Sequence, residues 1–272
     1  MSAWTESAVA AAAAAWVWVP PDADEVRTEA YQLARYPDRY FTHPACVLWS
    51  RTDGPVDELI DEVAGHVCGW GLSEVYWCVS ASTRPAGTEA ELMRRGATLD
   101  DTAQVLAYDM TDGLPELDEP PGISWSVVDD AAGLRAERLI NAEVWGQGGE
   151  AGEPDEAEIE SGLAEVREQL ADWSGFRVVA YLDGEPAAYG GCTPVDGVAR
   201  LWGAGTRTPL RGRGAYRVVL ARRMALARAH GATLALVKGR VATSAPILRR
   251  AGFRSYGEER TYKIAVGEGS AQ

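Results

Sequence analysis

Apolar residues recur along the chain at two spacings, and the order of these spacings predicts a mixed α/β fold. Alternation at every second position is typical of a half-buried strand, and recurrence at every third or fourth position is typical of a helix with one apolar face. In the C-terminal half the predicted order is a strand, two helices, three strands, a long helix, a strand, a short helix and a final strand or pair of strands. Their ranges are 123–128, 131–145, 154–173, 176–182, 186–193, 198–206, 215–230, 233–238, 244–250 and 254–266.

The N-terminal half shows a shorter version of the same order. The apolar run 8–19 is too short to span a bilayer and has no Lys or Arg before it, so it predicts a helix that leads into a strand over 16–19 rather than a signal peptide. The other predicted elements are helices over 22–35 (with Asp22 or Asp24 as its cap), 55–68 and 89–95, and strands over 45–51 and 74–80.

Gly and Pro are concentrated in residues 112–122, which is typical of a linker. The length of 272 residues is enough for two domains of ordinary size. We therefore predict an N-terminal domain over 1–111, a linker over 112–122 and a C-terminal domain over 123–272.

The chain is acidic as a whole, with 40 Asp and Glu residues against 26 Lys and Arg and a formal net charge of -14 at pH 7. A nucleic-acid backbone requires a basic surface, so this balance argues against nucleic acid as the main partner. The region from Gly197 to Gly257 differs, because it contains many Arg residues and one Lys but no Asp or Glu. We expect this region to bind one small polyanion.

The four Cys residues contain no C-x-x-C pair and the three His residues are scattered, so the sequence predicts neither disulfides nor a metal site. This usage is typical of reduced thiols in the cytoplasm. A content of 46% hydrophobic and 24% charged residues is typical of a globular protein that has no membrane partner.

The segment RGRGA at residues 211–215 lies between a predicted strand and a predicted helix. Its two glycines allow the backbone to curl and a ligand to approach closely, while the following helix directs unpaired N–H groups at the loop. This arrangement predicts an anion site, most naturally for a pyrophosphate. The alternative is a turn that connects strand and helix without a ligand.

Two motifs in this order, RGRGA at 211–215 and LRRAGF at 248–253, resemble the acyl-CoA-binding core of the GNAT acetyltransferase superfamily. The resemblance implies the GNAT acyl-CoA N-acyltransferase fold for residues 123–264. The N-terminal half repeats the order, with LMRRGA at 92–97, but it has no Gly/Arg loop between 45 and 55. It therefore looks like a degenerate tandem copy that lost its cofactor site and serves as a packing partner.

The resemblance implies acetyl-CoA as the acyl donor and coenzyme A as a product. Backbone groups of Ala204 and Thr206 would face the acetyl carbonyl and the pantetheine arm. The reaction would be direct attack of an amine on the thioester in a ternary complex. The pyrophosphate would be held by the backbone N–H groups of Arg211, Gly212, Arg213, Gly214, Ala215 and Tyr216.

The sequence departs from the family pattern in three places. Tyr216 is bulky where the loop motif ends on a small residue, the strand over 198–206 carries no acid, and Leu248 stands where a catalytic tyrosine is often found. Another residue near the sulfur of the thioester could donate the proton instead, although core packing or helix capping would also explain each candidate. The candidates are Tyr256, Tyr262 and Ser244 for the acid, and Glu143, Glu258, Glu259 or water alone for the base.

Acidic residues gather where the fold places its acceptor loop and second helix, and they suggest a cationic amine as substrate unless they form a solvated face. Trp145, Trp173 and Trp202 could form an aromatic wall or belong to the core. We predict a cytoplasmic N-acetyltransferase for a small-molecule amine, with a catalytically inactive acyl-CoA-binding sensor or interaction module as the alternative and a homodimer left open. The acidic residues are Glu150, Glu153, Asp155, Glu156, Glu158, Glu160 and Glu165.

Overall fold

The structure is a computed structural model, and it describes residues 4–38, 43–146 and 155–267. The chain forms two compact units, each built from several segments. The first unit contains Met1–Val9, Leu106–Lys238 and Ile247–Arg254, and the second contains Ala10–Val105, Gly239–Pro246 and Ser255–Gln272.

The first unit contains a sheet in the order β6-β7-β8-β9-β10. The first four strands are antiparallel neighbours, and β10 runs parallel to β9. Asp183 and Gly184 connect β7 to β8 with φ angles of 52° and 85°, as a tight hairpin turn requires. The strands are β6 (Ile123–Val127), β7 (Phe176–Leu182), β8 (Glu185–Val195), β9 (Val198–Thr206) and β10 (Leu234–Arg240).

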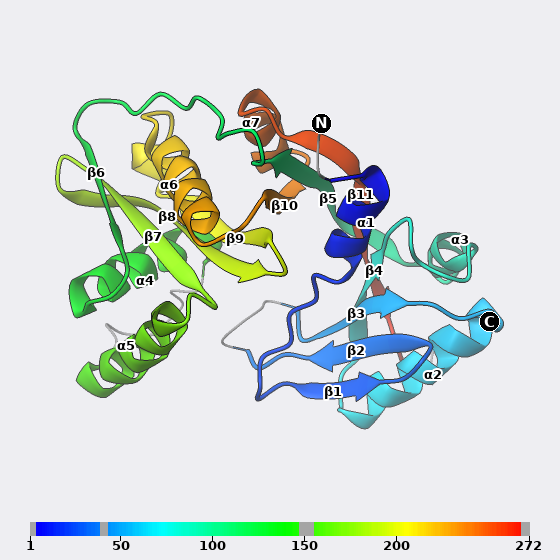
Figure 1. The fold of residues 1–272 in the computed structure, drawn as a ribbon. Helices are drawn as coiled ribbons and strands as arrows, with labels where there is room; N and C mark the ends of the chain where they lie inside the picture. The colour runs from blue at the N-terminus through cyan, green and yellow to red at the C-terminus, as the bar shows by residue number, and fades with distance from the viewer. Residues whose placement is uncertain (1–3, 39–42, 147–154, 268–272) are drawn as a thin grey trace. The chain divides into compact units, whose positions relative to one another are not determined.

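Helices cover both faces of this sheet (Figure 1). Val179 of β7 packs with apolar residues of α4 and α5, whereas the next residue, Ala180, packs with α6. Since successive side chains of a strand point to opposite faces, α4 and α5 lie on one face and α6 on the other. These elements are α4 (Ala131–Trp145), α5 (Glu156–Ala171), the 3-10 turn η1 (Thr208–Leu210), α6 (Ala215–Ala229) and α7 (Ser244–Arg250).

The second unit has a sheet in the order β1-β2-β3-β4-β11. Strands β3 and β4 are parallel, and the other neighbours are antiparallel. Trp77, which is fully buried, lies in the middle of the core that this sheet forms with α2 and α3. The elements are α1 (Glu6–Ala14), β1 (Asp24–Arg27), β2 (Tyr31–Arg35), β3 (Ala45–Ser50), α2 (Val56–Gly69), β4 (Glu74–Val79), α3 (Thr88–Arg94), β5 (Thr98–Asp109) and β11 (Arg254–Ala265).

The last strand of the chain belongs to the sheet of the N-terminal half. Tyr262 of β11 is the register partner of Trp77 of β4, and both lie in the core of the second unit. The end of β5 is exchanged in the opposite sense, because its residues from Leu106 onward belong to the first unit, where Met110 N donates a hydrogen bond to Thr233 O (2.8 Å). The predicted domains 1–111 and 123–272 are continuous stretches of sequence, whereas each unit combines several segments. These domain boundaries stay a prediction.

The order of elements predicted for the C-terminal half is confirmed, with β11 as a single final strand. In the N-terminal half two predictions are wrong. Residues 22–35 form the hairpin of β1 and β2 and not a helix, since Thr28 Oγ1 accepts hydrogen bonds from the Ala30 and Tyr31 amides and closes a turn. Residues 16–19 are not a strand; the carbonyl of Trp18 accepts a hydrogen bond from the Tyr36 hydroxyl instead.

No helix in the described ranges is long and apolar enough to cross a membrane.

The exchange of β11 predicts that a C-terminal side chain stabilises the N-terminal core. Ile264 is 3% exposed in that core, so Ile264→Ala should lower the free energy of unfolding by about 2–5 kcal/mol. Ile247 of α7 is 40% exposed, and Ile247→Ala is the matched control, with an expected change of about 0.5 kcal/mol. Urea unfolding followed by tryptophan fluorescence measures both. Equal small effects would show that β11 does not pack as described.

Candidate functional site

The Gly/Arg loop lies between η1 and the first turn of α6, and its two glycines adopt left-handed backbone angles. Gly212 has φ 76° and Gly214 has φ 92°. A Cβ atom on Gly214 would lie 2.4 Å from Cγ of Pro120, which belongs to the predicted linker, whereas a Cβ on Gly212 would have no heavy atom within 4 Å. Gly214 thus lets the linker pack against the start of α6, and Gly212 leaves the loop open.

The backbone N–H groups of this loop are available to a ligand. Within the described ranges, the amides from Gly212 to Tyr216 donate no hydrogen bond, and the first bonds at this end of α6 run from Arg217 and Val218 to the Gly214 carbonyl (2.9 and 3.3 Å). Unpaired N–H groups at the positive end of a helix dipole are an arrangement that favours anion binding. The arrangement fits the pyrophosphate of an acyl-CoA.

Several arginine side chains lie in or next to the loop, and the ion pairs that they form are weak. Arg213 pairs with Asp183 (3.3 Å) and Arg217 with Asp118 (3.7 Å), and all four side chains are at least 44% exposed. Arg211 donates from Nε to the Thr206 carbonyl (3.1 Å). Ion pairs between exposed groups contribute about 0–1 kcal/mol, so a phosphate can replace these carboxylates at little cost.

A β-bulge interrupts the ladder between β8 and β9 next to this loop. Tyr189 pairs with Gly205 and Gly191 with Trp202, so Gly203 and Ala204 of β9 both lie opposite the single residue Gly190. Gly203 has φ 62°, a left-handed angle that favours glycine. A bulge leaves backbone groups outside the ladder. The bulge contains Ala204, for which the sequence predicts contact with the acetyl carbonyl. Thr206 lies outside the bulge and pairs with Ala188.

Glu143, a predicted catalytic base, is held by an arginine. Its two carboxylate oxygens accept from Nε and Nη2 of Arg207 (2.9 and 2.8 Å), and Arg207 also pairs with Glu185 (2.6 Å). The hydrogen bonds from Arg207 lower the pKa of Glu143. A carboxylate paired in this way is a weak proton acceptor, so the geometry argues against this role.

The three predicted acids belong to the second unit, whereas Glu143 and the predicted cofactor residues belong to the first. Tyr262 is buried and donates a hydrogen bond to Glu89, and its pKa is raised by burial and by that carboxylate. A raised pKa makes Tyr262 a weaker acid. Ser244 is the first residue of α7, and Tyr256 lies half-buried on β11.

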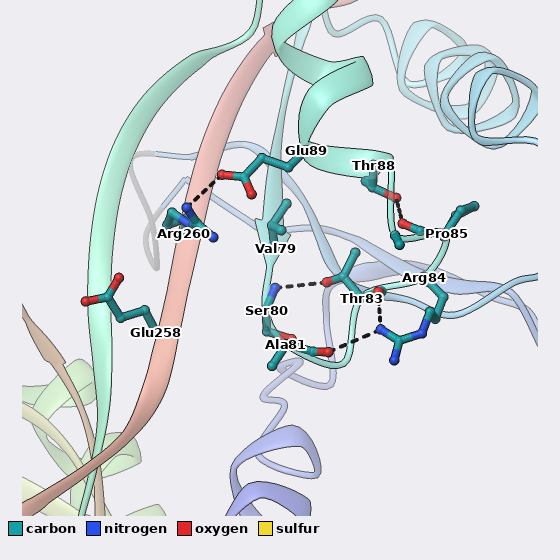
Figure 2. A pocket seen from close by; sticks show the side chains of 11 residues that line it. Val79, Ser80, Ala81, Thr83, Arg84, Pro85, Thr88, Glu89, Glu258 and Arg260 are labelled. Carbon is teal, nitrogen blue, oxygen red and sulfur yellow. Dashed lines mark hydrogen bonds and ion pairs between the residues drawn. The ribbon is translucent and has the colours of Figure 1, made fainter.

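The second unit contains a cavity of about 400 Å³ at the end of β4, which Figure 2 shows. Glu89 pairs there with Arg260 (3.0 Å), and Glu258 lies further along β11 with no partner among the residues drawn. Glu258, one of the bases considered, accepts from Gln104 Nε2 (3.4 Å). The lining is therefore polar, and Glu89 and Arg260 neutralise each other within it.

Comparison with known proteins agrees with this geometry. Residues 142–253, which include α6 and the bulge, match the sequence model of the Acetyltransferase (GNAT) family. The chain carries a GNAT acetyltransferase domain. The expectation from the sequence, an acyltransferase with this fold, is confirmed. No protein among the curated ones matches the chain.

Solved structures similar to the chain share the GNAT fold over most of its length. A GCN5-related N-acetyltransferase from Kribbella flavida is 18% identical over 92% of this chain and 91% of its own, with a TM-score of 0.62. Another from Sphaerobacter thermophilus is 18% identical over 88% and 78%, with a TM-score of 0.67. A tandem GNAT protein from the clavulanic acid biosynthesis pathway is 16% identical over 92% and 85%, with a TM-score of 0.59. At these identities the likeness concerns the fold alone.

Sequence reasoning missed the bulge of the GNAT domain and the arginine beneath it. Arg223 of α6 is 1% exposed, and its guanidinium occupies the space that Gly190 leaves by having no Cβ. The signal was present, because glycine within a strand indicates a bulge or a close approach of other groups. Both β8 and β9 contain such glycines at this level: Gly190, Gly191, Gly203 and Gly205.

The open position of Gly212 leads to a test of the anion site. Gly212→Glu places a carboxylate among the unpaired amides and should weaken coenzyme A binding by at least about tenfold. Gly231 is the matched control, because it lies at the other end of α6, has φ 92° and also has open space around a Cβ. Gly231→Glu carries the same backbone strain and should bind normally. Calorimetric titration with coenzyme A measures both, and similar losses in the two variants would refute the site.

Proposed function

We propose that this protein transfers an acetyl group from acetyl-CoA to the amine of a small molecule, by direct attack in a ternary complex. The observation that carries the proposal is the row of unpaired amides from Gly212 to Tyr216 at the positive end of α6. Such a row suits a diphosphate, which is the charged part of an acyl-CoA. The adjacent bulge supplies backbone groups for the rest of the donor.

The residues that would hold acetyl-CoA all belong to the first unit. The amides of Arg211 to Tyr216 would bind the pyrophosphate, with Arg213 and Arg217 moving from their exposed carboxylates to the phosphates. Ala204 in the bulge would face the acetyl carbonyl, and Thr206 would lie beside the pantetheine arm. The fold thus binds the donor mainly through backbone groups, which depend on local geometry rather than on side-chain identity.

We propose that water deprotonates the amine, because the carboxylate of Glu143 is engaged by Arg207. Tyr256 and Ser244 are the proposed proton donors for the departing thiolate, since Tyr262 is buried and already donates to Glu89. A hydroxyl within hydrogen-bond reach of the sulfur is what this step requires.

The acidic residues of α5 give limited support to a cationic acceptor. Asp155 and Glu158 form a capping box at the start of α5, and Glu165 pairs with Arg177 (3.5 Å). Glu156 lies 3.6 Å from Arg135 and is 93% exposed. These contacts are typical of a solvated helix face, and Glu150 and Glu153 lie outside the described residues. We therefore propose an amine acceptor without assigning it a net charge.

Thiol release from acetyl-CoA against a panel of primary amines tests the proposal. The panel should contain amino acids, polyamines and aminoglycosides, with Gly212→Glu as the inactive control. We expect release with at least one amine and none with the control. Binding of acetyl-CoA without release for any amine would favour the alternative, a sensor or interaction module that keeps the fold. Absence of binding would overturn both.

The pairing of Glu143 predicts a pH profile. A lowered pKa means that Glu143 is ionised throughout the range from pH 6 to 9, so its titration cannot produce an acidic limb there. Glu143→Gln should therefore keep the shape of the profile of kcat/KM against pH, even if the loss of the Arg207 pair lowers its height. Disappearance of an acidic limb in this variant would identify Glu143 as the base after all.

A further inference from the structure

Arg223 is a buried cation that the proposed mechanism does not use. It lies on the sheet-facing side of α6, is 1% exposed and is among the largest fully buried side chains described. A Cβ atom on Gly190 would lie only 2.7 Å from its Cζ. The side chain therefore fills a space that β8 keeps free by having glycine there.

The guanidinium of Arg223 bonds to the backbone of both strands at one end of the bulge. Nη1 donates to the Gly191 carbonyl of β8 (2.9 Å) and to the Trp202 carbonyl of β9 (3.3 Å), and Nε lies 3.4 Å from the Val219 carbonyl. The Tyr216 side chain lies near Arg223, whose charge opposes the rise in the Tyr216 pKa that burial causes. One side chain thus connects the strand pair at the bulge with the first turn of α6.

Burying the charge of Arg223 costs free energy, and packing alone does not explain why a charged residue fills this space. Within the described ranges no carboxylate pairs with it, and burial lowers its pKa, although a guanidinium stays charged in proteins. Replacing a buried ion pair by apolar residues of similar volume is often neutral or stabilising, so a buried charge is weak evidence for a role in stability. A buried cation kept at such a site suggests a role beyond stability.

We propose that Arg223 is a positioning residue that sets and polarises the backbone of the bulge, at Gly203 and Ala204, on which the acyl group of the donor is held. This inference rests on the proposed function. In a trans peptide the C=O and N–H groups point in opposite directions, so the bond to the Trp202 carbonyl turns the Gly203 N–H away from α6. Donation to that carbonyl also strengthens the N–H of the same peptide as a donor. Both effects favour binding of a carbonyl oxygen at the bulge.

The test compares Arg223→Met with Arg222→Met. Arg222 is the neighbouring residue and a matched control, because its side chain is partly exposed, pairs with Glu119 and lies over the Trp125 ring (4.8 Å to the centroid). The measurements are the thermal transition, the affinities for acetyl-CoA and coenzyme A, the infrared band of bound acetyl-CoA labelled with ¹³C at its carbonyl, and kcat.

We expect Arg223→Met to melt at the wild-type temperature or above and to bind coenzyme A within about threefold of the wild type. Its carbonyl band should return toward that of free acetyl-CoA, its preference for acetyl-CoA over coenzyme A should disappear, and kcat should fall by about tenfold or more. Arg222→Met should match the wild type in all four measurements. A carbonyl band and kcat in Arg223→Met equal to those of Arg222→Met would overturn the inference.

Three further outcomes are decided in the same experiment. If Arg223→Met does not fold, Arg223→Lys, which keeps the charge but loses the planar fork, replaces it, and an unchanged carbonyl band in that variant overturns the inference. If the wild type binds neither acetyl-CoA nor coenzyme A, the proposed function itself fails. If the wild type and the Arg223 variant both bind acetyl-CoA and both shift its carbonyl band, only the role of Arg223 is refuted.

Discussion

Helix α6 begins with N–H groups that its own backbone cannot satisfy, and the surrounding chain is built to leave them open. A short turn, two left-handed glycines and the linker residue Pro120 bring the chain into the helix without offering these groups an acceptor. In most helices a capping side chain fills this role. Gly214 has no side chain to do so, and the electrostatic field at the helix end is therefore available to an external anion.

The bulge of β9 interrupts the regular ladder close to this helix, and the bulge and the helix are physically linked. The guanidinium of Arg223 bonds to the carbonyls beside the bulge, and it lies near Tyr216 in the first turn of α6. A displacement of α6 along the sheet would therefore disturb both places together. The close packing of Gly190 of β8 against this guanidinium leaves little room for independent adjustment.

The sequence predicts the C-terminal half better than the N-terminal half, for physical reasons. Helices such as α4 and α5 carry their own start signals, Asp130 and the capping box of Asp155, so local patterns determine them. The residues of β1 and β2 also fit a helical spacing, so only their pairing with each other and with β3 identifies them as a hairpin. The loop could be placed from its glycines. The bulge, the Glu143 pair with Arg207 and the burial of Arg223 depend on contacts between distant segments, which no local pattern records.

The position of β11 also determines when the protein can fold as it is made. Tyr262 and Ile264 complete the core around Trp77, yet they are synthesised only after all the elements from α1 to α7. The N-terminal half must wait with an unpaired edge on β4 until its last strand arrives, and contacts between such distant positions form slowly. A nascent or truncated chain that ends before residue 254 exposes this edge. Quality control by chaperones and proteases would therefore act on the N-terminal half, although the missing piece lies at the other end of the sequence.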